Sequence, residues 1–562
     1  MKINKKVVIL SGLIIVSSIY SFIFFKNTQS IYTTGDLSFH LSRIKGLSTI
    51  FTSPINYETF NYTGYGVNYF YPFLTFFPAV MLYWMTKNLI VSYIIYVWLL
   101  NLCTTLVAYH YGERFLKQKK AAFLFSCLYI FSAYRTVDIY YRSAIAEAIA
   151  ITLVIPVLFY AYQIISGKEE KYPSVKLALS MSLLVYSHVL STLMSTALII
   201  IFIFIRLVSK GFKNADFIAI FKKLFSAAGM TLVLTSAFWY PMFEQMLYQK
   251  INKPSVTNLY AHASNVFDSL TEAMNNDLTT YSMGLVGLLS LCIPLILFKK
   301  LTNIEKKIYY GTCLTWLATT SLVPWYLLQN TPAKLLQFPW RILSLQIIFS
   351  SLILTMIFFK NRRYNKTREL FYLFMTVLLL ITLTVSSKKN FNQKIISQPG
   401  HIVVNKETVE AYTTKGMDYF LYDYSPIASL ENKEHIIKHE AKIGSQWVNL
   451  PYKTTGSSII YRVTNEKSQV ITLPVYAYLG TNVEINHQPV KEQVNANGLV
   501  QISGVKGVAD IKVSTNYTVT TIISYLVTLT AYLCLFFKIV FHKRVKSIIL
   551  CKILYNVLPV SH

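Results

Sequence analysis

The chain has 562 residues, of which 54% are hydrophobic and only 14% are charged. An ordinary soluble protein carries roughly a quarter of its residues as charged side chains, so this composition excludes a soluble fold. The formal net charge of +28 does not indicate a nucleic-acid partner, because Lys and Arg lie in short clusters between apolar spans and not on one face. All six cysteines lie within or beside apolar segments, so neither a disulfide framework nor a metal cluster is predicted.

The first apolar run, 7–25, follows three lysines and has the basic start of a signal peptide. It lacks a small-residue cleavage site at its end, where two phenylalanines precede Lys26. We therefore interpret this run as a retained first span with the N-terminus inside.

Basic clusters mark the cytoplasmic ends of membrane spans, so they predict the path of the chain. The predicted inside segments are 114–120, 168–176, 206–223, 299–307, 360–368 and the tail from 538. The apolar spans predicted between them are 121–134, 148–165, 177–208, 224–240, 284–298, 309–328, 342–359, 370–387 and 518–537. This path has about 12 crossings and places both termini in the cytoplasm.

Two apolar regions do not fit a simple succession of single membrane crossings. If 71–86 and 89–110 were both full crossings, the basic segment 114–120 would lie outside. We therefore predict that 71–86 is an interfacial or re-entrant helix and that 89–110 crosses inward. The stretch 177–208 is too long for one helix and is flanked by basic clusters at both ends, so we predict an out-and-back hairpin with its bend near Ser187 and His188.

From 388 to 516 the composition becomes polar, and short runs such as 459–463, 483–486, 500–502 and 511–513 alternate with period two. This pattern is typical of antiparallel strands. The predicted fold class is an α-helical polytopic membrane protein with a small extracytoplasmic β-sandwich. The predicted domains are a transmembrane domain 1–387 with a large first outer loop 26–70, a β-rich domain 388–516, and a final span with a basic tail, 517–562.

This path brings several polar residues to the outer face. In the first outer loop, a helix capped by Asp36 would place Asp36, His40 and Arg43 on one face. The carboxylate can take a proton from an acceptor hydroxyl, and Arg43 can pair with a phosphate oxygen. The alternative is an N-cap followed by a juxtamembrane ion pair.

A second cluster lies at 135–147 between two spans. Arg135 opens it, and Asp138 and Arg142 are one helical turn apart, so they can neutralise each other. Glu147 lies at the mouth of an apolar helix, where an ionised group usually has a partner or a function.

Two further outer segments contribute candidates. His188 lies at the predicted hairpin bend and is either a ligand or a structural residue. Trp340 and Arg341 open a span and are either an interface anchor or a cation and an aromatic plane that face a phosphate or a sugar. The tyrosines and phenylalanines between 57 and 71 suit sugar rings or an isoprenoid tail, and they equally suit a membrane-interface belt.

No P-loop, Rossmann fingerprint, nucleophile elbow, HExxH or CxxC motif occurs, so no nucleotide cofactor is expected. Several segments nevertheless carry a family resemblance: 35–43 (GDLSFHLSR), 141–148 (YRSAIAEA), 187–191 (SHVLS), 336–341 (LQFPWR) and 473–480 (LPVYAYLG). The first resembles the start of GT-C glycosyltransferases. The set resembles bacterial YfhO-like membrane proteins, some of which are labelled "6-pyruvoyl-tetrahydropterin synthase-related". That label describes soluble chemistry that we do not expect of this chain.

The resemblance implies an inverting transfer of a sugar from a polyprenyl phosphate to a cell-surface glycan, teichoic acid or lipid. Asp36 would then be the base, Glu147 a second acidic residue, and Arg43, Arg142 or Arg341 would hold the lipid phosphate. His40, Arg135, Asp138, His188 and Trp340 complete the predicted substrate-binding set. The first loop has one acid and not the adjacent acidic pair of the GT-C pattern, so no metal ligands are assigned and a divalent cation stays open.

Two other functions fit the same sequence. A transporter or flippase for a lipid-linked intermediate would place ionisable groups near the midpoints of its spans. A non-enzymatic envelope assembly protein would depend on the β-domain and not on Asp36.

Overall fold

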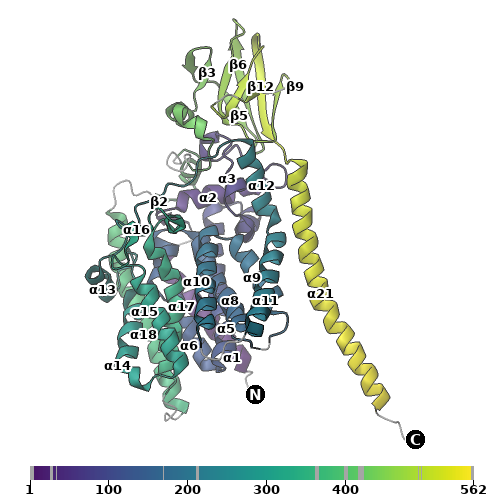
Figure 1. Ribbon diagram of the computed structural model, residues 1–562. Helices are drawn as coiled ribbons and strands as arrows, with labels where there is room; N and C mark the ends of the chain where they lie inside the picture. Colours follow the sequence, from purple (N-terminus) through teal and green to yellow (C-terminus); the bar gives the residue numbers. More distant parts are fainter. Residues whose placement is uncertain are drawn as a thin grey trace.

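The computed structural model describes residues 5–25, 29–32, 34–168, 170–209, 214–360, 366–397, 403–415, 423–490, 493–494 and 497–557, with side chains as far as residue 538. Long helices form an upright bundle, and a strand-rich domain stands on one end of it (Figure 1). The final helix descends from that domain along the outside of the bundle.

The helices of the bundle and its loops have the following bounds: α1 Lys5–Phe24, α2 Leu37–Gly46, α3 Val67–Phe70, α4 Phe77–Thr86, α5 Leu89–Leu116, α6 Lys119–Ile130, α7 Ala133–Thr136, α8 Ile145–Ile165, α9 Pro173–Val185, α10 Val189–Leu207, α11 Asn214–Leu234, α12 Ser236–Tyr248, α13 Val266–Asn275, α14 Gly284–Ile296, α15 Asn303–Leu317, α16 Trp325–Leu328, α17 Leu343–Phe358, α18 Lys366–Ile396 and α21 Val519–Val557. The short helices α19 Val409–Thr414 and α20 Lys433–Ile437 lie between α18 and the strands.

Eight helices among the described residues are long and apolar enough to cross a membrane. The bent pair Lys119–Ile130 and Ala133–Tyr141, with 52° between its parts, makes a ninth if it is one span. Three shorter apolar helices, Leu74–Thr86, Pro173–Val185 and Gly284–Ile296, account for much of the difference from the predicted 12. Each is shorter than the roughly 20 residues that a crossing needs, so the count of 12 stays a prediction.

The stretch 71–86 forms a short helix, as predicted, and not a full span. It runs from Leu74 to Thr86, about 20 Å, and two residues separate it from α5. The Tyr96 hydroxyl donates to the Thr75 carbonyl over 2.7 Å, so the start of the short helix lies beside the second turn of α5. The two helices therefore run antiparallel, which is the arrangement expected of a re-entrant segment.

Other element boundaries confirm or correct the predicted spans. The chain breaks between α9 and α10 at residues 186–188, which confirms the predicted hairpin bend. The span predicted at 224–240 is wrong at both ends, because α11 begins at Asn214 and ends at Leu234. Lys222 and Lys223 lie within α11 and are exposed; long lysine side chains can reach water from a membrane helix. The span predicted at 309–328 ends early, at Leu317.

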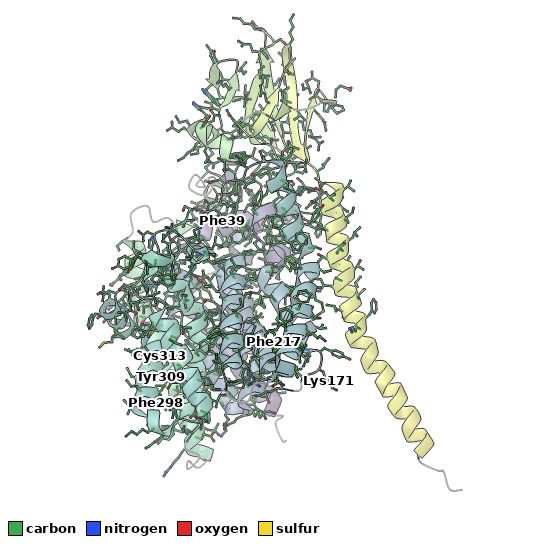
Figure 2. The ribbon with its side chains drawn as sticks, viewed as in Figure 1. Phe39, Lys171, Phe217, Phe298, Tyr309 and Cys313 are labelled. Atoms are coloured by element: carbon green, nitrogen blue, oxygen red, sulfur yellow. The ribbon has the colours of Figure 1, made fainter. Side chains whose placement is uncertain are left out.

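The basic loops predicted to lie inside do meet at one end of the bundle. Ion pairs join three pairs of residues from different loops or their flanking helices: Arg114 with Glu170, Lys120 with Glu369, and Lys360 with Glu305. Lys171 and Phe298, from two of these loops, both lie in the lower part of the bundle in Figure 2. Residues 169, 210–213, 361–365 and 558–562 of the predicted inside segments lie outside the described residues.

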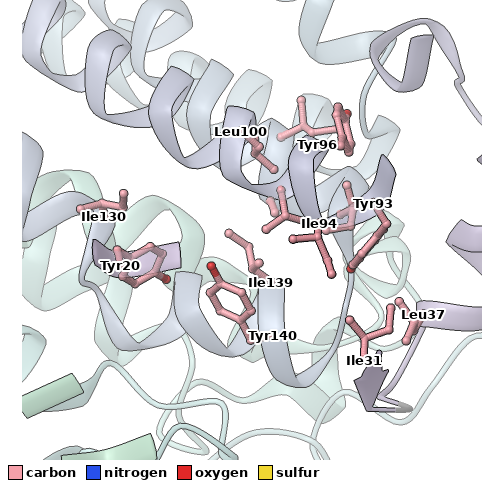
Figure 3. Close-up of a cluster of buried hydrophobic side chains, with 14 of the residues drawn as sticks. Tyr20, Ile31, Leu37, Tyr93, Ile94, Tyr96, Leu100, Ile130, Ile139 and Tyr140 are labelled. Carbon is pink, nitrogen blue, oxygen red and sulfur yellow. The ribbon is translucent and has the colours of Figure 1, made fainter. Parts of the chain in front are cut away.

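A buried apolar cluster ties the first helix to the outer loops. Tyr20 of α1 packs edge-on against Tyr140, with ring centroids 5.7 Å apart, and the Tyr20 hydroxyl hydrogen-bonds Thr136 over 2.9 Å. Ile31 and Leu37 of the first outer loop belong to the same cluster (Figure 3). The start of α2 is therefore fixed to the helices below it.

Two five-stranded antiparallel sheets confirm the predicted β-sandwich. One has the order β10-β11-β7-β3-β4 and the other β5-β6-β12-β8-β9. Their strands are β3 Ala441–Ile443, β4 Gln446–Val448, β5 Tyr452–Thr454, β6 Ser458–Asn465, β7 Ile471–Tyr476, β8 Thr481–Ile485, β9 Gln488–Val490, β10 Gln493–Val494, β11 Leu499–Ile502 and β12 Gly507–Thr515. A separate short pair joins β1 Ile31–Tyr32 to β2 Val403–Val404.

The aromatic residues of the first outer loop pack under the sandwich, which corrects both interpretations of them. Tyr57, Phe60, Tyr65, Tyr69 and Phe70 are buried in one cluster with the inward side chains of the strands. The Tyr57 hydroxyl hydrogen-bonds the Thr515 hydroxyl of β12 over 2.8 Å. These rings therefore hold the sandwich on the bundle and are not free for a sugar or for lipid.

Gly66 allows the closest approach in this interface. A Cβ at this position would lie 2.6 Å from the Tyr478 ring. We expect Gly66→Ala to lower stability by about 1–3 kcal/mol, because the ring must shift to make room. The check is the thermal unfolding midpoint of the detergent-solubilised protein. Gly229→Ala, in α11, is the matched control, since nothing lies within 4 Å of its Cβ and Ala favours a helix. An equal effect of the two substitutions would contradict the role of Gly66.

Candidate functional site

The buried carboxylate of Glu147 is the centre of a cluster of charges at the end of the bundle below the sandwich. Its side chain is 1% exposed. Oε1 accepts a hydrogen bond from the Tyr134 hydroxyl over 2.6 Å, and Oε2 accepts one from Arg142 Nη1 over 2.8 Å. Arg341 Nε lies 3.5 Å from the same oxygen. Two arginines from distant parts of the chain therefore share one carboxylate.

Arg142 links Glu147 to two further acids. Its Nη1 also donates to Asp138 Oδ1 over 2.7 Å, which confirms the predicted pairing of Asp138 and Arg142. Its Nη2 lies 4.0 Å from Asp36 Oδ2. Three carboxylates therefore surround one guanidinium, and Arg341 supplies a second positive charge.

A break in the helices makes this convergence possible. After α6 ends, the chain turns by 52° into α7 and a π-helical turn, Val137–Tyr141. Ser143 has a positive φ of 53°, and the Ala144 amide donates to the Asp138 carbonyl over 2.9 Å. The chain reverses there and enters α8 at Ile145, so residues 138, 142 and 147 face one point.

The first outer loop is attached to this turn through its backbone. The Asp36 amide donates to the Arg142 carbonyl over 2.7 Å. Gly35 has φ +26°, and a Cβ there would lie 2.1 Å from the Arg142 oxygen. Only glycine permits this approach, which brings Asp36 to the arginine.

Asp36 is the accessible acid of the cluster. Its side chain keeps 40% of its surface exposed, against 0% for Asp138 and 1% for Glu147. Burial of the surrounding site raises the pKa of Asp36 above its ordinary value, although the charges of Arg142 and Arg341 oppose that rise. Asp36 occupies the N-cap position of α2, as predicted, but its side chain makes no capping hydrogen bond, so the carboxylate is left to the site.

His188 joins the cluster from the break between α9 and α10. Its Nδ1 hydrogen-bonds the Ser191 hydroxyl over 2.8 Å. Burial lowers its pKa to about 4; Glu147 opposes this shift, and Arg341 and Arg142 add to it. The imidazole is therefore neutral at pH 7.

The predicted shared face of Asp36, His40 and Arg43 does not form one surface. His40 and Arg43 are each 1% exposed. The Arg43 guanidinium lies between the rings of Tyr71 and Phe76, at 4.4 and 4.7 Å, and donates to the Pro72 carbonyl over 2.7 Å. Contrary to our prediction, both side chains pack against Phe76 at the start of the short helix Leu74–Thr86 and not against an accessible phosphate position.

Arg135 also departs from its predicted place. It is fully buried in the bundle, where its Nη2 donates to Asn101 Oδ1 and to the Thr104 hydroxyl, both over 2.9 Å. The side chain turns to α5 because amide and hydroxyl oxygens there satisfy it. It is therefore not part of the accessible substrate-binding set.

Trp340 lines the site and packs against its arginines. Its ring stacks on Tyr281 at 3.9 Å and on Phe338 at 4.9 Å, and it is 6% exposed. The Arg142 guanidinium lies 4.9 Å from its centroid. With neighbours on both faces, Trp340 supports the two arginines and does not present a free face to a sugar.

Sequence reasoning missed several tyrosines of the site. Tyr134 donates to Glu147. The Tyr71 hydroxyl, whose pKa burial raises to about 12, feels the charges of Asp36, Arg341 and Arg142. Tyr424, from the segment that leads to the sandwich, packs edge-on against Tyr71 with 6.4 Å between ring centroids. The chain has 41 tyrosines, and no local sequence pattern distinguishes the tyrosines of the site from the rest.

Among the described residues, no group of three or more His, Cys, Asp or Glu side chains is placed to hold a metal ion. Asp138 and Glu147 already accept hydrogen bonds from Arg142. Asp138 and Glu147 therefore do not fit a metal ion, because their charge is used to neutralise arginine.

A family model described as the 6-pyruvoyl-tetrahydropterin synthase related domain, a membrane protein, matches residues 67–393, which is more than half of the chain. The chain belongs to this family. Membership agrees with the predicted multi-pass membrane localisation. The matched region of this family member holds Asp138, Arg142, Glu147, His188 and Arg341, whereas Asp36 precedes it.

No curated protein matches the chain. Two cryo-EM structures of the arabinofuranosyltransferase AftD from Mycobacteria, one of them of a mutant, match with a TM-score of 0.42 each and sequence identities of 13% and 12%. The alignments cover 67% of this chain and 26% and 27% of those chains. This family member therefore spans about a quarter of the length of those proteins.

We expect Glu147→Gln to destabilise the protein strongly, by about 3–5 kcal/mol, because it removes a buried charge that two arginines share. Asp36→Asn is the matched comparison and should change stability much less, because Asp36 is 40% exposed. Thermal unfolding of both variants in the same detergent checks this order. A smaller loss for Glu147→Gln than for Asp36→Asn would show that Glu147 does not organise the cluster.

Proposed function

We propose that this protein is an inverting membrane glycosyltransferase that transfers a sugar from a polyprenyl-phosphate donor to a hydroxyl of a cell-surface glycan or lipid at the outer face. The observation that carries the proposal is Asp36: an accessible carboxylate 4.0 Å from Arg142. A base next to fixed positive charges suits a reaction in which a hydroxyl loses a proton and a phosphate leaves.

In the proposed reaction, an Asp36 carboxylate oxygen takes the proton of the acceptor hydroxyl. The hydroxyl oxygen attacks the anomeric carbon from the face opposite the phosphate and forms the new glycosidic bond. The bond from that carbon to the phosphate oxygen breaks, and its electron pair stays on the polyprenyl phosphate. Configuration at the anomeric carbon is therefore inverted.

Arg142 and Arg341 would stabilise the charge that grows on the leaving phosphate. Glu147 would act as a positioning residue, because it is buried and holds both guanidinium groups. The two predicted catalytic acids, Asp36 and Glu147, therefore have different roles in the proposed reaction. Asp36 exchanges the proton, and Glu147 keeps the arginines in place without touching the substrate.

Asp36→Asn tests the proposal. It removes the base but preserves the side-chain shape, so transfer should fall by about 10²- to 10⁴-fold while membrane insertion is unchanged. The measurement is mass spectrometry of surface polymers from a deletion strain that carries the variant or the parent gene. Asp216→Asn is the matched control, because Asp216 pairs with Arg206 near the opposite end of the bundle.

Two results would contradict the proposal. The first is an intact surface glycan pattern in the Asp36→Asn strain. The second is transport of a lipid-linked intermediate by proteoliposomes that perform no sugar transfer, which would favour the transporter.

The proposed base also predicts a pH dependence. Only the ionised form of Asp36 accepts a proton, so activity should fall as the pH drops through a pKa that lies above the ordinary value for aspartate. Arg341 lowers this pKa, so Arg341→Gln should raise it further and move the acidic limb of kcat/KM to higher pH. The measurement is the rate of sugar transfer as a function of pH in isolated membranes. The sugar donor for this assay is chosen from the sugar that the mass spectrometry of surface polymers finds missing in the deletion strain. An unmoved acidic limb would contradict the assignment of that limb to Asp36.

A further inference from the structure

One flank of helix α13 exposes large apolar side chains. Phe267 is 78% exposed and Met274 is 67% exposed. The two lie seven residues apart, about two helical turns, and so share one flank. Ser269 and Ala273 face the protein instead and are buried, and the Ser269 hydroxyl oxygen accepts a hydrogen bond from Trp316 Nε1 of α15 over 3.1 Å.

The neighbouring flank of the same helix is polar. Asp268 and Asn275 are exposed and lie about 100° from the apolar pair around the helix; Thr271, also exposed, lies between them and the apolar pair. A helix that packs on its protein with one exposed apolar flank and one exposed polar flank suits the boundary between hydrocarbon and water.

The apolar surface continues onto the adjoining loop. Leu322, Tyr326 and Leu327 are 65%, 64% and 64% exposed. Backbone hydrogen bonds from the Ser264 amide to Thr319 and from the Ser321 amide to Ser264 join this loop to the start of α13. We call Phe267, Met274, Leu322, Tyr326 and Leu327 together the apolar collar.

The helices beneath the collar are too short to cross a bilayer by themselves. Helix α14 has 13 residues and α15 has 15, about 20 and 22 Å, whereas the hydrocarbon core is about 30 Å thick. The basic residues Lys299, Lys300, Lys306 and Lys307 mark the other end of this hairpin. Figure 2 shows Phe298, Tyr309 and Cys313 in ascending order along it.

We propose that the apolar collar is embedded among the acyl chains of the outer leaflet. The hydrocarbon then extends beyond the ends of α14 and α15 as far as α13, which lies beside their upper part in Figure 1. The short helices also present apolar side chains outward, such as Leu314, which is 64% exposed on α15. Acyl chains cover both surfaces without a break.

The loop of the collar is linked to the charge cluster. The loop that carries Leu327 runs on through Gln337, whose side-chain oxygen accepts a hydrogen bond from Arg341 Nη1 over 2.6 Å. The segment that carries the collar is therefore in direct contact with Arg341 of the charge cluster. This inference concerns the lipid surface and does not depend on the proposed transferase activity.

Photo-crosslinking in native membranes tests the collar. The photoreactive amino acid p-benzoylphenylalanine replaces Phe267, Asp268 or Leu314 in separate variants of the full chain, and tryptic peptides are searched for phospholipid adducts after irradiation. We expect adducts at position 267 at a yield close to that at 314, the lipid-facing reference, and at least five-fold above that at 268. Folding is checked by the elution profile of each purified variant.

Two results would overturn the proposal. A yield at 267 as low as that at 268 would mean that water covers the flank. A crosslink from 267 to another protein chain, without lipid adducts, would mean that a protein partner covers it.

Discussion

The need to neutralise the buried Glu147 carboxylate determines how the charged groups around it are arranged. A carboxylate at the head of an apolar helix is stable only if it is paired and hydrogen-bonded. Here Tyr134, Arg142 and Arg341 meet that need, and they come from α7, the turn before α8 and the turn before α17. Because Arg142 must face Glu147, its backbone carbonyl is presented to the Asp36 amide. The position of the accessible acid thus follows from the neutralisation of the buried one.

The sequence predicted the fold best where the positions of basic clusters and the lengths of apolar stretches could be used together. Basic clusters grouped the correct loops at one end, and the conflict around 114–120 was enough to predict a short helix at 71–86. The boundaries of α11 and α15 were missed, because lysines on a membrane helix can reach water through their own length. A long apolar stretch can also continue as a loop, as it does after Leu317.

Part of the predicted set of residues lies together in the structure. Asp36, Asp138, Arg142, Glu147, His188 and Arg341 converge because they all come from loops or helix ends at the same end of the bundle. Arg43 and Arg135 do not join them, since carbonyl, amide and hydroxyl oxygens elsewhere satisfy these guanidinium groups. These hydrogen-bond partners are common residue types that no sequence motif marks, and only the three-dimensional structure brings them next to the arginines. The tyrosines of the site escaped prediction for the same reason.

The attachment of the sandwich has a mechanical consequence. Its strands lie between α18 and α21, two helices long and apolar enough to cross the membrane, and its lower face rests on the aromatic residues of the first outer loop. A body anchored at both chain ends and seated on a third support resists tilting about any axis in the membrane plane. Force applied to the sandwich would therefore pass directly into the loop that holds Asp36.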